Sequence, residues 1–287
     1  MEKELAAIGE SDALSPELNA KVERMLSTIA SWQSCAVAFS GGVDSAVVAK
    51  AAQRALGDRA LAVTGVSPSL AEGELQSARS LAELIGIRHE VIHTQEFASE
   101  DYTRNAADRC YYCKTELYTQ MDQLIERFQV AVAVNGANVD DLGDYRPGLQ
   151  AAGEHQVRSP LADCGINKAE VRQLARHWQL PVWDKPAAPC LSSRVAYGEE
   201  VTPQRLRMID QAEMYLRGLG LREVRVRFHP GDLARVEVPS AEIARLLDDV
   251  AREELVRHLQ SLGFKFVTLD LMGFQSGSLN RLVQLKT

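Results

Sequence analysis

The chain has 287 residues, 46% of them hydrophobic and 25% charged, and its 32 basic and 39 acidic residues give a formal net charge of −7. This composition is typical of a globular protein. It excludes a disordered or collagen-like chain and counts against a protein that coats nucleic acid. No apolar run approaches the roughly 20 residues that a membrane-spanning helix needs, and the acidic N-terminus does not resemble a secretory signal. We therefore expect a cytoplasmic protein with no membrane partner, whose five cysteines are candidates for metal binding or thiol chemistry rather than disulfides.

The first two thirds of the chain alternate between helical and strand patterns. The first helical pattern follows Ser15 and Pro16, which suit the N-cap and the first turn of a helix. In chain order we predict a helix at 15–32, a strand at 34–39, a helix at 44–56, a strand at 60–66, a helix at 70–85, a strand near 89–93, a helix at 114–128 and a strand at 130–135. Most of these strands are apolar throughout, which indicates a parallel sheet covered on both faces. The pattern predicts an α/β fold with a doubly wound parallel sheet.

The pattern changes after Gly198, where we predict a second, smaller α/β domain. Two segments there alternate apolar and charged residues around a His-Pro-Gly-Asp turn, which predicts a hairpin with one wet face. The predicted elements are a helix at 202–216, strands at 221–228 and 233–238, a helix at 240–262 and a strand at 265–269. We place the boundary in the Pro- and Ser-rich stretch 185–202, so the predicted domains are 1–198 and 199–287.

The most specific motif is SGGVDS, which lies between a predicted strand and a predicted helix. Gly41 and Gly42 permit backbone angles that other residues avoid and let the main chain approach a ligand closely. The N–H groups of the loop and of the first helical turn then point at an anion. The hydroxyls of Ser40 and Ser45 can donate to phosphate oxygens, whereas Asp44 would be repelled by bare phosphate and therefore suggests a bridging Mg²⁺. The motif predicts a phosphate-binding loop without the Walker lysine.

SGGVDS resembles the PP-loop of the ATP pyrophosphatases, the superfamily of NAD synthetase, GMP synthetase, argininosuccinate synthetase and the tRNA thiolases. The resemblance implies their adenine nucleotide alpha hydrolase-like fold and the use of ATP and Mg²⁺. It also implies their reaction, in which ATP is split between the α- and β-phosphates. A substrate oxygen is adenylated, and a nucleophile then displaces AMP.

Further segments narrow the resemblance to one family. They are DRCYYCK at 108–114, NGANVDD at 135–141, PCLSSR at 189–194 and, in the small domain, RVR at 225–227 with Glu237. Together they resemble the LarE family over nearly the whole chain, from about residue 22 to 274. That family consists of ATP-dependent sulfur transferases that make the nickel-pincer cofactor of lactate racemase. The resemblance implies a pyridinium dicarboxylate mononucleotide as substrate, with a carboxylate that is adenylated and converted to a thiocarboxylate.

The sulfur source is predicted to involve three cysteines. An adenylated carboxylate needs a sulfur nucleophile, and Cys190 lies in a polar loop with Arg194 four residues on, whose charge would favour the thiolate. In the LarE family some members consume one cysteine and end with dehydroalanine. Others hold a [4Fe-4S] cluster on three cysteines, with one iron open to carry sulfide. We predict such a cluster on Cys110, Cys113 and Cys190. The alternative is a sacrificial Cys190, with the C-x-x-C pair structural or redox-active.

The remaining cysteines and the histidines are not assigned to the site. Cys35 lies in a predicted strand and fits a small buried residue. Cys164 stays undecided, and no pair of histidines has ligand spacing on a predicted helix.

Two further groups of polar residues are candidates for ligand binding. Arg225 and Arg227 share one face of a predicted strand, which suits either a solvated face or a clamp for the substrate phosphate. Glu237 on the neighbouring strand can pair with them and fix their side chains. Asp140 and Asp141 follow a strand beside the PP-loop, where they either help to hold Mg²⁺ or form a turn without a ligand.

The leading hypothesis is therefore an ATP-dependent sulfur transferase that acts on a small nucleotide-like carboxylate, as a homo-oligomer and without a nucleic-acid partner. A tRNA thiolase is an alternative, but the net charge and the lack of a Lys- and Arg-rich RNA domain count against it. An ammonia ligase similar to NAD synthetase would not explain the cysteines. A non-catalytic adenine-nucleotide sensor with a structural metal would have no use for a metal site that lacks one ligand.

Overall fold

The computed structural model describes residues 14–143, 147–275 and 278–279. The chain forms two compact units, and neither is contiguous in sequence. The first unit takes in the chain up to Val66 together with Gly73–Thr94 and Cys113–Ala188, and the second takes in Ser67–Glu72, Gln95–Tyr112 and the chain from Pro189. Within the described ranges, no helix is long and apolar enough to cross a membrane.

A parallel sheet forms the centre of the first unit. Among the described residues it has four strands in the order β3-β2-β1-β4. They are β1 (Cys35–Ala38), β2 (Ala60–Val66), β3 (Arg88–His93) and β4 (Val132–Val134). The chain runs outward from β1 to β3 and then crosses back to β4, so the strand order reverses between β1 and β4. Ligands of open α/β sheets bind at the carboxyl ends of the strands at such a reversal.

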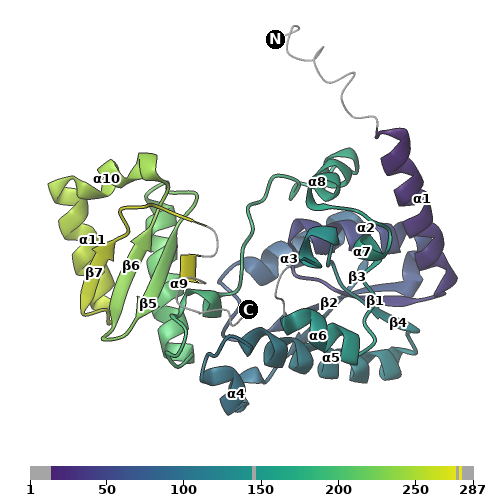
Figure 1. The fold of residues 1–287 in the computed structure, drawn as a ribbon, viewed down its shortest axis with the longest axis horizontal. Helices are drawn as coiled ribbons and strands as arrows, with labels where there is room; N and C mark the ends of the chain where they lie inside the picture. Colours follow the sequence, from purple (N-terminus) through teal and green to yellow (C-terminus); the bar gives the residue numbers. More distant parts are fainter. Residues whose placement is uncertain (1–13, 144–146, 276–277, 280–287) are drawn as a thin grey trace, which may run out of the picture. The chain divides into compact units, whose positions relative to one another are not determined.

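Helices cover both faces of this sheet, with α1 and α2 on one side and α5 and α6 on the other (Figure 1). The helices are α1 (Pro16–Ser31), α2 (Val43–Leu56), α3 (Glu74–Ile85), α5 (Arg109–Phe128), α6 (Pro147–Glu154), α7 (Pro160–Asp163) and α8 (Lys168–His177). The core lies between the sheet and α1, α2, α3 and α8, with Met25, Ile29, Val37, Val47 and Leu174 almost completely buried. The predicted doubly wound α/β fold is confirmed.

The start of α5 differs from the prediction. The helix begins at Arg109 and not at residue 114, so Cys110 and Cys113 lie in its first turns, one turn apart. Residues 110–117 are only partly buried or exposed, so the apolar periodicity that marks a helix is weak there. The bounds of α2 agree within one residue, and α3 begins four residues later than predicted, after Gly73 in the left-handed conformation.

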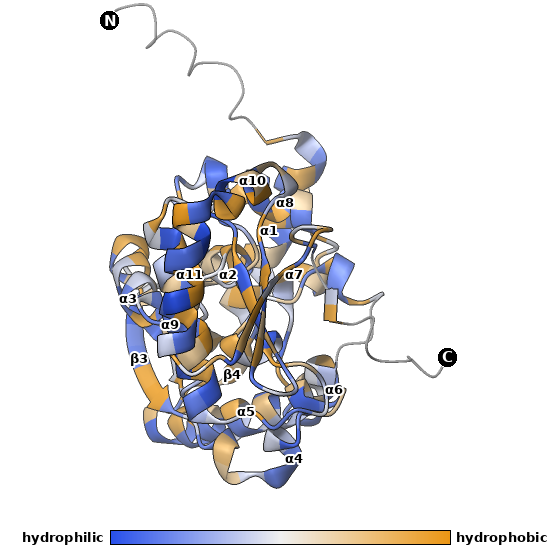
Figure 2. Ribbon diagram, turned by 90° about the vertical axis from the view of Figure 1, so that its left-hand side faces the viewer, coloured by the Kyte–Doolittle hydropathy of each residue, from blue (hydrophilic) through white to orange (hydrophobic). Residues whose placement is uncertain are grey.

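The second unit contains a small mixed sheet. Among its described residues the strand order is β5-β6-β7, with β5 antiparallel and β7 parallel to β6. Its elements are α4 (Glu100–Thr103), α9 (Pro203–Gly218), β5 (Arg225–His229), β6 (Leu233–Glu237), α10 (Ile243–Leu247), α11 (Asp249–Ser261) and β7 (Phe266–Leu269). Figure 2 shows hydrophilic and hydrophobic residues alternating along α9 and α11, as expected for helices with one buried side.

Two predictions for the second unit are wrong in detail. The single helix at 240–262 is broken at Asp248, whose backbone is extended and whose side chain caps α11 by accepting from the Val250 and Ala251 N–H groups. The hairpin is confirmed, but β5 has no wet face, since Arg225 and Arg227 are only 8% and 6% exposed. Their charges are held inside the unit, so the alternating pattern does not mark a solvated face.

Candidate functional site

The loop between β1 and α2 has the geometry of an anion-binding turn. Gly41 has a φ of +71°, which L side chains rarely adopt, and a Cβ there would lie 3.4 Å from Ala78. The Ser45 hydroxyl donates to the Gly42 carbonyl at 3.0 Å and accepts from the Ser40 N–H at 3.2 Å. In the described structure no side chain caps α2 at Gly42. The first N–H groups of α2 and the positive end of its dipole therefore suit a phosphate.

Asp44 has a counter-charge that sequence analysis did not identify. Its carboxylate lies 2.5 Å from Lys168 Nζ and accepts a hydrogen bond from Asn138 Nδ2 at 3.1 Å. Lys168 is the first residue of α8, and Asn138 follows β4, so both belong to the same unit as the loop. Because Lys168 offsets the Asp44 charge, Mg²⁺ is no longer the only means by which this carboxylate can tolerate a nearby phosphate.

The segment after β4 packs against the PP-loop. A Cβ at Gly136 would lie 2.8 Å from the Ser45 nitrogen, so only glycine fits this close approach. Asp141 accepts from the Asn138 N–H at 3.0 Å, and Asp140 accepts from the Lys168 N–H at 2.8 Å. Both aspartates thus stabilise turns and helix ends, which favours the interpretation of this segment as a turn that places Asn138 on Asp44.

The Cys190 loop, defined as residues 189–193, lies in the second unit and is bound through its backbone. Arg194 donates to the carbonyls of Pro189 and Cys190, the latter at 2.9 Å, and its Nε donates to Glu213 at 3.0 Å. The side chains of Arg194 and Glu213 are 4% and 0% exposed. Arg194, which sequence analysis placed beside the Cys190 thiol, is therefore paired with Glu213 and holds the main chain of the loop.

Two cysteines influence the pKa of Arg109. Its side chain is buried, and Nη1 donates to the Ser192 carbonyl at 2.7 Å. Burial lowers the pKa of Arg109, but the electrostatic effects of Cys190, then Cys110 and Tyr102, together with a hydrogen bond to Cys110, outweigh it, and the net pKa is raised. Since both thiols act on one guanidinium, Cys110 and Cys190 both lie near Arg109. Both are exposed.

The other cysteines occupy different environments. Cys113, one turn after Cys110 in α5, is partly buried. Cys35 and Cys164 are buried, and burial raises the pKa of Cys35 to about 12, so these two are structural. As the described side chains stand, no group of three or more His, Cys, Asp or Glu residues is placed to hold a metal ion.

Arg225 and Arg227 lie on β5 within the small sheet. Arg227 donates through Nε and Nη2 to Glu237 at 3.0 and 2.8 Å, which confirms the predicted pairing, and through Nη1 to the Ser193 carbonyl at 3.1 Å. Arg225 stacks on Phe274 at 5.2 Å. Burial, followed by the charge of Arg194, lowers the pKa of Arg225 to about 10, while Glu213 acts in the opposite direction. Arg225 is therefore a poorly hydrated cation, which suits an anionic ligand.

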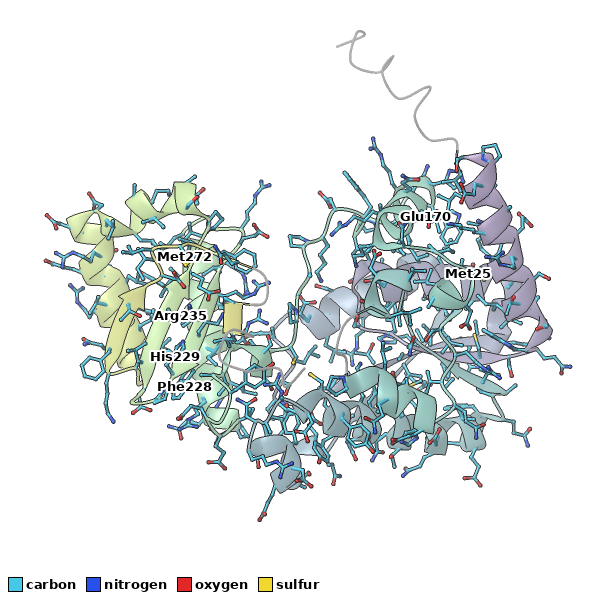
Figure 3. The ribbon with its side chains drawn as sticks, in the orientation of Figure 1. Met25, Glu170, Phe228, His229, Arg235 and Met272 are labelled. Atoms are coloured by element: carbon cyan, nitrogen blue, oxygen red, sulfur yellow. The ribbon has the colours of Figure 1, made fainter. Side chains whose placement is uncertain are left out.

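Glu237 also forms an ion pair with Arg235, two residues earlier on β6. Arg235 Nη2 lies 3.1 Å from Glu237 and Nη1 lies 2.5 Å from Asp270. Figure 3 shows Arg235 beside His229 on the small sheet, and Arg235 Nε lies 3.0 Å from His229 Nε2. Burial first, and then the charge of Arg235, lowers the pKa of His229.

Comparison with known proteins agrees with this geometry. The family model of NAD synthase matches residues 16–115. The parallel sheet and the strand–SGGVDS–helix turn define the class: the protein is a PP-loop enzyme of the ATP pyrophosphatase type. Over 265 residues it is 39% identical to the pyridinium-3,5-bisthiocarboxylic acid mononucleotide synthase of Lactiplantibacillus plantarum, which covers 92% of this chain and 95% of the relative. The chain therefore belongs to the LarE family of ATP-dependent sulfur transferases.

Two other relatives differ in how much of this chain they match. The protein slr1717 of Synechocystis sp. is 48% identical over 93% of this chain and 99% of its own length. The tRNA-specific 2-thiouridylase MnmA of Azorhizobium caulinodans is 30% identical, but the match covers 52% of this chain and 48% of that enzyme. The similarity to a tRNA thiolase therefore extends over about half of each chain, whereas the similarity to the LarE synthase extends over nearly all of both.

These comparisons confirm the resemblance, the fold and the enzyme class that the sequence predicted. Use of ATP and Mg²⁺ follows from membership of the PP-loop family. Lys168 was not predicted from the sequence, and no role was predicted for Arg109 or Asn138. The Asn-x-x-Glu capping box at 167–170 was a detectable signal for the helix that starts with Lys168.

Proposed function

We propose that this chain converts a carboxylate of a pyridinium dicarboxylate mononucleotide into a thiocarboxylate. The proposal is supported by the similarity to the L. plantarum relative, a synthase of pyridinium-3,5-bisthiocarboxylic acid mononucleotide. The observation in this chain that carries sulfur transfer is the pair of exposed thiols, Cys110 and Cys190, beside the buried guanidinium of Arg109. We further propose that the enzyme is cytoplasmic, acts as a homo-oligomer and needs no nucleic acid.

ATP activation is assigned to the loop at Ser40–Ser45. A substrate carboxylate oxygen attacks the α-phosphorus and pyrophosphate leaves, which gives an acyl adenylate. Gly41, Gly42 and the α2 N–H groups stabilise the leaving pyrophosphate, and Asp44 would hold an Mg²⁺ ion that supplies further positive charge there. Lys168 supplies a further positive charge at the same carboxylate.

Sulfur transfer from Cys190 is the simplest second step. Its thiolate attacks the acyl carbon, AMP leaves, and a thioester links substrate and protein. Removal of the Cys190 α-proton and cleavage of its Cβ–S bond then leave the sulfur on the substrate as a thiocarboxylate. The protein keeps dehydroalanine at position 190 and has lost the elements of H₂S. This route gives one sulfur atom per chain.

A [4Fe-4S] cluster on Cys110, Cys113 and Cys190 is the other candidate donor. Three thiolates are the ligand chemistry that such clusters use, and Cys110 and Cys190 both act on Arg109. The described side chains form no metal-binding group as they stand, so the cluster rests on the donor chemistry alone. When bound, it would supply an iron that carries added sulfide and spare Cys190.

Mass spectrometry after one turnover distinguishes the two donors. Dehydroalanine at position 190, with Cys110→Ala and Cys113→Ala variants still active, supports the sacrificial route. An intact Cys190, repeated turnover on added sulfide, and iron and acid-labile sulfide in anaerobically prepared protein support the cluster. Cys35→Ala is the matched control, because Cys35 is fully buried in the core of the other unit. The absence of thiocarboxylate under both conditions would contradict sulfur transfer itself.

The substrate phosphate is assigned to Arg225 and Arg227. Both are buried, both lie on β5, and Arg225 has a pKa lowered to about 10, first by burial. Replacing Arg225 by Lys keeps a charge but loses the planar fork, which should weaken acceptor binding by about 1.5–3 kcal/mol with little change in ATP affinity. Isothermal titration with each ligand measures this difference. Equal losses for both ligands would indicate a folding defect.

A further inference from the structure

The Cys190 loop is attached to the segment that leads into α5 by a closed ring of hydroxyl groups. Ser69 Oγ lies 2.6 Å from Tyr102 Oη and 2.8 Å from Ser192 Oγ, and Tyr102 and Ser192 are 2.7 Å apart. The side chains are almost completely buried, at 5%, 1% and 0% exposure for Ser69, Tyr102 and Ser192. In such a ring each hydroxyl donates one hydrogen bond and accepts one. The Leu191 N–H also donates to the Ser69 carbonyl at 2.9 Å, so backbone and side chain attach the loop at the same place.

Arg109 makes a second attachment. Its Nη1 donates to both Ser192 O at 2.7 Å and Asn105 Oδ1 at 2.5 Å. Asn105 in turn donates through Nδ2 to the Ala196 carbonyl at 2.9 Å. Arg109 precedes Cys110 in the chain, so its buried guanidinium links the start of α5 to the loop that carries Cys190. A hydrogen bond from a charged donor is stronger than one between neutral groups.

We propose that Arg109 and Tyr102 are positioning residues that hold the Cys190 loop against the start of α5, so that the Cys110 and Cys190 sulfur atoms face a common space. The role of the two thiols rests on the proposed sulfur transfer, but the positioning does not depend on which of them delivers sulfur. Neither residue reacts. Arg109 binds the Ser192 carbonyl and Tyr102 binds the Ser192 hydroxyl, and an exposed thiol needs such support to keep a set position.

Cross-linking of the ligand-free protein with dibromobimane tests the positioning without any turnover. The background variant is Cys113→Ser, so that the cross-link of interest joins Cys110 to Cys190. Peptide mass spectrometry gives the ratio of this cross-linked product to the product in which each of the two cysteines carries its own reagent molecule. We expect Tyr102→Phe, which opens the hydroxyl ring, to lower this ratio about fivefold. Arg109→Met should lower it about tenfold or more, since it removes charge-assisted hydrogen bonds.

Controls separate positioning from general stability. Arg104→Met removes an arginine whose side chain is 53% exposed and pairs with Asp101 at 3.0 Å, and its cross-linking ratio should match that of the background variant. Arg109→Lys keeps the charge but loses the planar fork. If Arg109→Met does not fold, the cross-linking ratios of Arg109→Lys and Tyr102→Phe test the positioning. Circular dichroism confirms folding of each variant.

Unchanged cross-linking in folded Arg109→Lys and Tyr102→Phe would overturn the proposal, whatever their stability. If the cross-linking ratio is unchanged and sulfur transfer is intact, the positioning is contradicted but the proposed function is not. A lowered ratio in a protein that transfers no sulfur supports the positioning and contradicts the proposed function.

Discussion

Replacing Glu237 by Gln should destabilise the second unit more than any other conservative change of a charge on the small sheet. The carboxylate is completely buried and accepts from Arg227 Nε and Nη2, from Arg235 at 3.1 Å and from Ser278 Oγ at 2.6 Å. An amide keeps the shape and one acceptor but leaves the Arg227 charge without its carboxylate. Arg235 still contacts Asp270. Removing one partner of a buried ion pair costs about 3–5 kcal/mol.

Urea unfolding followed by circular dichroism measures this change as a lower transition midpoint at an unchanged slope. The matched control is Glu242→Gln, because Glu242 pairs with Arg245 at 2.5 Å on the surface, where such a pair contributes about 1 kcal/mol or less. A total stability of about 5–15 kcal/mol makes the expected loss easy to detect. A loss for Glu237→Gln no larger than for the control would refute the view that buried charge holds β5 to β6.

The remaining predictions concern the PP-loop and the core. Asp44→Ala should abolish pyrophosphate release with the fold intact, and ADP and phosphate as products of the unmodified enzyme would contradict the assigned ATP cleavage. Lys168→Met should raise the KM for ATP, measured by pyrophosphate release, because Asp44 loses its counter-charge. An Asp140→Asn, Asp141→Asn double variant should keep its Mg²⁺ dependence, and an altered dependence would restore these residues as ligands. Burial raises the pKa of Cys35 to about 12, so iodoacetamide at pH 8 should label it only after unfolding in urea, as peptide mass spectrometry would reveal.

The large unit could be predicted from sequence because its strands are short, apolar and separated by clear breaks. Cys35–Ala38 and Ala60–Val66 are buried over most of their length, and their pattern is that of a parallel sheet. SGGVDS was identified for the same reason: glycines that need special backbone angles leave a local signal. Local signals of this kind do not depend on contacts between distant segments.

The parts that could not be predicted depend on long-range contacts. The ion pair between Asp44 and Lys168 joins residues 124 positions apart, and nothing near either residue indicates the other. The charges of Arg225 and Arg227 resemble a solvated face in sequence, yet both are buried. Alternation of polar and apolar residues reports the two faces of a strand. The pairing with Glu237 on the next strand was predicted, but alternation does not report that the whole ion pair is buried.

The side chain of Cys190 is exposed, whereas buried arginines bind the backbone around it. This arrangement suits a reactive thiol. Arg194 binds the carbonyls of Pro189 and Cys190, and Arg227 binds that of Ser193, so guanidinium groups fix the chain on both sides of the thiol. A nucleophile must be accessible to its substrate, but it reacts fastest when little conformational freedom is lost on the way to the transition state. Fixing the main chain and leaving the thiol exposed meets both requirements. Arg227, which the sequence predicted as a candidate for substrate binding, therefore also fixes the backbone near Cys190. If it does bind the substrate phosphate as proposed, loss of acceptor binding in an Arg227 variant should be accompanied by slower alkylation or transfer at Cys190.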